Sequence, residues 1–119
     1  MIAHVVLFRP RHDLSPDERR DLAAAFSAAV TQIPSIRRAR VGRRVRHGRP
    51  YEQLMNVDYS HAVVIEFDDV EGLTAYLNDP VHEQLATRFF AGFEHALMYD
   101  FELGEGDRAL TALVEDADE

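Results

Sequence analysis

The sequence contains no cysteine, no lysine and no tryptophan, and it has no long apolar run. Without cysteine, disulfides, thiolate metal sites and a cysteine nucleophile are excluded. No apolar segment approaches the ~18 residues of a membrane-spanning helix, and the N-terminus lacks a basic region followed by an apolar stretch. We therefore expect a cytoplasmic protein that does not act at a membrane.

All thirteen basic side chains are arginine, and the net charge is −8. Because an acidic protein repels nucleic acid, we expect no nucleic-acid partner. Seven of the arginines fall within residues 37–49. This cluster could bind an anionic substrate, but a solvated face, or one paired with acidic residues of the same chain, is the more common role of such a cluster.

At 119 residues, of which 46% are hydrophobic, the chain is long enough for one domain with a buried core. Periodic apolar segments occupy residues 1–103, which we interpret as the domain. Residues 104–119 begin with two glycines and are acidic, so we predict a C-terminal tail with a turn or two of helix. We expect this tail to dock near the arginine-rich strand.

The apolar pattern predicts strands over residues 2–8, 36–46, 59–67 and 96–102, and helices over 16–33, 70–77 and 80–95. The loop 47–57 separates the second and third strands. This order is typical of a ferredoxin-like α+β domain, βαββαβ, with a four-stranded antiparallel-type sheet. We expect the first and third strands to lie side by side and parallel. One face of the sheet remains apolar and uncovered by helices, which predicts a face-to-face homodimer.

Three segments carry a family resemblance: His-Val-Val-Leu-Phe at 4–8, Val-Ile-Glu-Phe at 64–67, and Tyr-Leu-Asn-Asp-Pro-Val-His at 76–82. Over residues 1–103 the chain resembles the stress-responsive A/B barrel (Dabb) family, which implies a dimeric α/β barrel. Asp79 replaces the first histidine of the family's third motif. Directly before Pro80, this aspartate is expected to cap the following helix.

The best-understood catalytic branch of that family comprises plant cyclases that close a linear polyketide into a resorcylic acid by aldol condensation. By motif position, the resemblance implies that His4, His61, Tyr76 and His82 are the pocket residues of this chain. It also implies that neither a metal nor a cofactor takes part. The ligand would be a small, mostly apolar carbonyl compound.

The residue types suit this chemistry. His82 lies in the first turn of a helix, where free amides disfavour a positive charge, so a neutral imidazole can act as a general base. Tyr76 can donate its hydroxyl to an enolate oxygen, while His4 and His61 orient the substrate. We expect an apolar cavity lined by Phe8, Ile65, Leu85, Phe89 and Phe93.

Two other interpretations stay open. A histidine in an apolar strand is often a core residue bonded to a neighbouring carbonyl, and the protein would then be a non-enzymatic stress-response or accessory protein with a filled pocket. Alternatively, the chain is a cofactor-free monooxygenase of a related barrel family. The absence of tryptophan disfavours the haem-dependent relatives, which use a tryptophan in the pocket.

Overall fold

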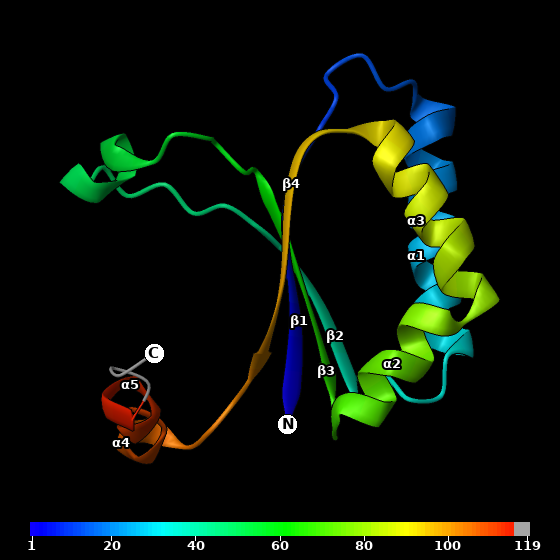
Figure 1. Ribbon diagram of the computed structural model, residues 1–119. Coiled ribbons are helices and arrows are strands. Elements are labelled where there is room, and N and C mark those ends of the chain that lie inside the picture. The colour runs from blue at the N-terminus through cyan, green and yellow to red at the C-terminus, as the bar shows by residue number, and fades with distance from the viewer. Residues whose placement is uncertain (116–119) are drawn as a thin grey trace.

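A computed structural model describes residues 1–115, with the backbone alone for Asp107 and Ala112. Its elements are β1 (Ile2–Pro10), α1 (Pro16–Gln32), β2 (Arg38–Arg43), the 3₁₀ helix η1 (Pro50–Leu54), β3 (His61–Phe67), α2 (Val70–Asn78), α3 (Pro80–Gly92), β4 (Phe93–Glu102), α4 (Gly106–Ala109) and α5 (Thr111–Glu115). The strands form one sheet in the order β2-β3-β1-β4, and α1, α2 and α3 cover one face of it (Figure 1). The predicted ferredoxin-like α+β fold is confirmed.

One detail of the predicted topology is wrong: β1 and β3 are neighbours but run antiparallel, with His4 opposite Ile65 and Phe8 opposite His61. The physical reason lies in the connections. The crossover through α1 leaves β1 and β2 parallel, and the loop 44–60 returns the chain so that β3 runs opposite to β2. Since β3 lies between them, it is antiparallel to both.

The helix starts follow the local sequence. Ser15 Oγ accepts a hydrogen bond from the Glu18 amide at 3.1 Å, and Glu18 Oε1 accepts one from the Ser15 amide at 3.1 Å, so the predicted capping box begins α1. Asp79 Oδ1 accepts from the Val81 amide at 2.8 Å and begins α3. Asp79 is therefore the helix cap that the sequence predicts, and it fixes the corner between α2 and α3.

The core lies between the sheet and the helices. Ile65 and Phe67 on β3 are almost fully buried, and Val6 and Phe8 of β1 and Leu85 of α3 belong to the same cluster. Burial of each such side chain stabilises the fold by about 1.5–3 kcal/mol. Among the described residues, His4 is the one buried polar side chain.

The predicted helix 80–95 is shorter than expected, because α3 ends at Gly92 and Phe93 already belongs to β4. Phe93 pairs with Pro10 at a register shift in β1, and the Arg11 amide donates to the Gly92 carbonyl at 2.9 Å. The long β1 strand offers sheet hydrogen bonds in place of the last helical turn. Phe93 thus extends from a strand, not from a helix.

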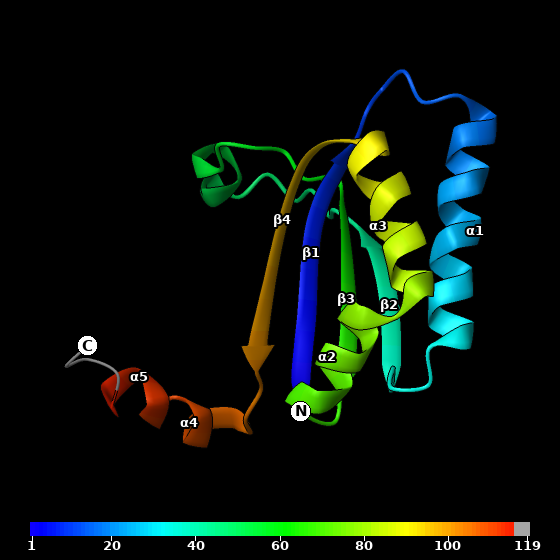
Figure 2. The ribbon, with the colours of Figure 1, turned by 45° about the vertical axis from the view of Figure 1, so that its right-hand side comes forward.

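None of the described helices packs against the other face of the sheet (Figure 2). On β4 this face presents Leu97, Tyr99 and Phe101, which are 39%, 58% and 51% exposed. The loop with η1 and the segment with α4 and α5 both project on this side (Figure 1). None of the described helices is long and apolar enough to cross a membrane.

The expected contact between the tail and the arginine-rich strand of the same chain is wrong for the described residues. The tail continues from β4, which forms the edge of the sheet opposite to β2. The arginines of this segment form ion pairs with carboxylates that lie closer to them than the tail does. Arg37 pairs with Asp68, Arg40 with Glu66, and both Arg44 and Arg46 with Asp58. Asp116, Asp118 and Glu119, which also belong to the predicted acidic tail, lie outside the described residues.

Candidate functional site

His4, Tyr76 and His82 meet between the sheet and the helices. His4 projects from β1 to the covered face, Tyr76 is in the last turns of α2, and His82 is in the first turn of α3. The centroids of the His4 and Tyr76 rings lie 5.8 Å apart, and those of Tyr76 and His82 lie 4.5 Å apart. The helix corner at Asp79 therefore brings two of the predicted site residues over the third.

A fourth polar group, Asp100 of β4, joins this cluster. Its Oδ1 lies 2.6 Å from Nδ1 of His4, which it faces in the register of the β1–β4 pair. Because a carboxylate only accepts hydrogen bonds, Nδ1 of His4 is the donor in this contact. Asp100 was not among the site residues predicted from the sequence. The available signal is its alternation, since it shares the inward face of β4 with Met98 and Ala96.

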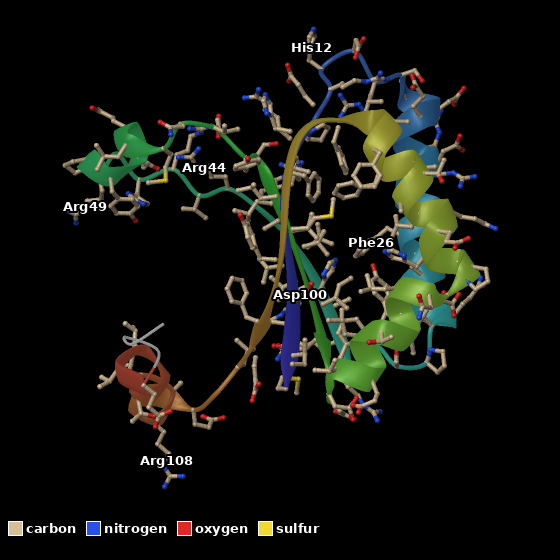
Figure 3. The ribbon with its side chains drawn as sticks, viewed as in Figure 1. His12, Phe26, Arg44, Arg49, Asp100 and Arg108 are labelled. Carbon is tan, nitrogen blue, oxygen red and sulfur yellow. The ribbon has the colours of Figure 1, made fainter. Side chains whose placement is uncertain are left out.

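The cluster borders an apolar cavity of about 130 Å³ that is partly open to solvent. Of the predicted lining residues, Ile65, Leu85 and Phe89 line this cavity, whereas Phe8 and Phe93 do not. Phe26 of α1, labelled in Figure 3, completes part of the wall. The site thus combines polar groups with an apolar chamber about the size of one ring.

Burial sets the protonation of two site residues. It raises the pKa of Tyr76 to about 12, with a smaller contribution from the negative charge of Asp100. Burial also lowers the pKa of His82 below its usual value, helped by repulsion from His4 and opposed by the Leu77 backbone. Near neutral pH the site therefore holds a protonated phenol beside a neutral imidazole.

His61 lies at the other end of the same face. It faces Phe8 in the β1–β3 register, and its ring stacks on that of Phe8 with centroids 5.4 Å apart and planes 15° apart. Phe8, which His61 faces, lies four residues along β1 from His4, a distance of about 13 Å. His61 lines a second cavity of about 350 Å³ together with Phe8 and Phe93. The structure therefore brings three of the four predicted residues together and leaves His61 outside.

The described residues contain no group of three or more His, Cys, Asp or Glu side chains placed to hold a metal ion. The acidic residues that follow β3 have other partners: Asp69 Oδ1 accepts from the Gly72 amide at 2.8 Å and caps α2, and Asp68 pairs with Arg37. The acidic residues that follow β3 therefore belong to the start of α2.

The fold and the site define a ferredoxin-like α+β protein with a histidine–tyrosine–histidine cluster at a cavity between sheet and helices. The chain belongs to the Stress responsive A/B Barrel Domain (Dabb) family, whose model matches residues 2–103. The family predicted from the three motifs is confirmed. No curated protein matches the sequence.

Solved structures of similar fold come from plants and bacteria. Hydroxynitrile lyase from Passiflora edulis is 18% identical, with a TM-score of 0.74 over 88% of this chain and 94% of the other. A dimeric ferredoxin-like protein of unknown function from Thermobifida fusca is 25% identical, with a TM-score of 0.65 over 86% and 90%. SnoaB, a cofactor-independent oxygenase from Streptomyces nogalater, is 17% identical, with a TM-score of 0.62 over 88% and 94%. These likenesses establish the shared fold.

Proposed function

We propose that this protein binds a small, mostly apolar carbonyl compound and acts on it as a cofactor-free cyclase or related lyase. The observation that carries the proposal is the convergence of His4, Tyr76 and His82 on one partly open apolar cavity. Polar groups with shifted pKa values in an apolar cavity are a common feature of catalytic sites.

His82 is the general base, because its lowered pKa keeps the imidazole neutral and able to take a proton from carbon next to a carbonyl group. Tyr76 keeps its proton and donates a hydrogen bond to the enolate oxygen that forms. His4, held by Asp100, orients the substrate. In an aldol cyclisation the carbanion then attacks a second carbonyl group of the same molecule, and the protonated His82 returns its proton to the new alkoxide. Water then leaves, and the ring enolises to the aromatic product. His61 has no contact with the substrate in this proposal.

The size of the cavity limits the ligand. An apolar cavity of ~150 Å³ admits benzene, so the chamber of about 130 Å³ takes little more than one six-membered ring. Leu85 and Phe89 line both this cavity and the larger one beside His61. A longer substrate would have to extend past these side chains or out of the mouth of the cavity.

The first test is ligand binding, followed by turnover. Benzaldehyde, acetophenone and a linear 3,5,7-triketo ester are screened for a rise in melting temperature, and ring formation from the ester is followed by ultraviolet absorbance. Tyr76→Phe and His82→Gln should each lower turnover by about 100-fold or more while the chain stays folded. His61→Gln is the matched control and should retain activity. Unchanged turnover in both site variants would overturn the proposal.

The fold alone is compatible with other chemistry, since its neighbours include a hydroxynitrile lyase and a cofactor-independent oxygenase. The same screen separates the alternatives. Oxygen consumption in the presence of a hydroquinone, without ring formation from the ester, would favour the monooxygenase. No change in melting temperature with any compound would favour a non-enzymatic protein.

The proposal includes a homodimer that covers the open face of the sheet. Leu97, Tyr99 and Phe101 form an exposed apolar strip there, and monomers seldom leave such strips uncovered. The Thermobifida fusca relative is dimeric. Light scattering should give twice the 13.6 kDa mass of the chain, and Tyr99→Asp should give the monomer. A monomeric native protein would contradict the dimer.

A further inference from the structure

The described parts of two oppositely charged segments do not meet within one chain (Figure 3). The arginine-rich segment, residues 37–49, starts in β2 and runs into the loop of η1. The acidic tail, residues 104–119, follows β4. In Figure 3, Arg49 near the end of the loop and Arg108 in the tail lie far apart. Since β2 and β4 are opposite edges of the sheet, about 14 Å separates the two strands.

The arginine-rich segment has spare charge and exposed apolar surface. Arg38, Arg43 and Arg49 are exposed and make no ion pair with any described carboxylate. In the β2–β3 register Arg38 lies on the uncovered face, whereas Val41 and Arg43 lie on the helix-covered face. Val45, beyond β2, is 77% exposed. The uncovered face and the loop therefore offer Arg38, Val45 and Arg49 to a partner with carboxylates and an apolar face.

The acidic tail offers such a face. Leu110, Leu113 and Val114 are 59%, 72% and 76% exposed, and the carboxylates of Glu105 and Glu115 flank them. The helices α4 and α5 have four and five residues. Because helices this short are unstable alone in water, the exposed apolar side chains of the tail indicate a surface on which it docks.

We infer that the acidic tail of one copy docks on the arginine-rich segment of a second copy. Charge complementarity supports a second copy as the occupant, because the chain of net charge −8 supplies its own dense cationic segment. Continuity supports it too: the exposed strip of β4 ends at Phe101, and the exposed Leu103 and Leu110 extend it into the tail. The inference rests on the homodimer proposed above, but not on any catalytic activity.

Cross-linking in the full-length chain tests the contact, since the protein has no cysteine of its own. Glu115→Cys and Arg49→Cys chains with different tags are co-expressed, purified as mixed dimers and treated with a short bismaleimide. The expected product is a covalent dimer that carries both tags. The matched control pairs Glu115→Cys with Arg20→Cys, which lies on the outer side of α1 and should not cross-link. A yield no higher than in this control, or only internal cross-links in a chain carrying both Glu115→Cys and Arg49→Cys, would overturn the inference.

Charge reversal gives an independent measurement. Glu105→Arg together with Glu115→Arg should raise the dimer dissociation constant about fivefold, measured by sedimentation at low salt. Adding Arg38→Glu and Arg49→Glu to the same chain should restore it. The difference should shrink in 1 M NaCl, where exposed charges are screened beyond about 3 Å. A stable dimer with an unchanged constant contradicts tail docking alone, whereas a native monomer contradicts both the docking and the homodimer.

Discussion

His4 and His61 project from the same face of the same sheet, yet their surroundings are different. At the His4 end, polar groups from three elements follow one another: Asp100 bonds His4, and the rings of Tyr76 and His82 come next. At the His61 end, the ring stacks on Phe8 among other aromatic side chains. A histidine becomes part of a candidate site through its neighbours rather than through the face on which it lies.

The two cavities repeat this contrast. The smaller one, about 130 Å³, borders every member of the polar cluster except Asp100, while the larger one, about 350 Å³, borders His61 with Phe8 and Phe93. The larger of these two cavities is therefore not the one that His4, Tyr76 and His82 border. This difference can be tested by changing matched residues at the two ends.

Tyr76→Ala should have the largest effect on stability. The Tyr76 side chain is 2% exposed and contacts Phe67 as well as both site histidines, so its removal should lower the free energy of unfolding by about 3–5 kcal/mol. Tyr76→Phe, which keeps the ring, should cost less than about 1.5 kcal/mol. Urea denaturation gives both values. If Tyr76→Ala costs no more than Tyr51→Ala in the exposed loop, the ring does not hold the site together.

Asp100→Asn should have the second-largest effect on stability. The change keeps the shape of the side chain but weakens the charge-assisted hydrogen bond to His4, and a cost of about 1 kcal/mol is expected because Asp100 is partly exposed. Glu94→Gln, which weakens the ion pair with Arg9 on the same two strands, is the control. An equal effect in the two variants would mean that the His4–Asp100 bond is an ordinary surface pair.

Much of the fold could be predicted from local sequence. The capping box at Ser15 and the break at Pro80 mark helix starts, and alternation marks the strands, because these signals act within a few residues. Strand direction could not be obtained in this way: the expectation that β1 and β3 are parallel was wrong. Direction depends on connections that span the whole domain.

The same dependence on long-range pairing explains which residues of the candidate site could be predicted from the sequence. Its residues on β1, α2 and α3 could be named because they stand in recognisable motifs. Asp100 stands in none, and only the antiparallel register of β1 and β4 reveals that it faces His4. His61 shares the inward face of β3, as its alternation predicts, but the register places it opposite Phe8. Alternation therefore identifies the face of a strand, whereas the position along that face requires the pairing.

Histidines at both the His4 end and the His61 end of the sheet should make stability depend on pH. Burial lowers the pKa of His82 and of His61, so below the usual value of about 6.5 the unfolded chain binds protons that the folded chain does not. Stability should therefore fall as the pH decreases from 7 to 5. His82→Gln and His61→Gln should each flatten this slope in urea titrations. An unchanged slope in both variants would show that neither ring resists protonation.

His61→Phe should have the smallest effect and separates the two ends most directly. A phenyl ring can keep the stacking on Phe8, and the main loss is the 2.8 Å hydrogen bond with Ser60, so stability should change by less than about 1 kcal/mol. The rise in melting temperature with a carbonyl ligand should remain, whereas His4→Phe should abolish it by removing the partner of Asp100 at the cavity. If His61→Phe abolishes the ligand response as well, the two cavities form one binding site and the division between the ends is wrong.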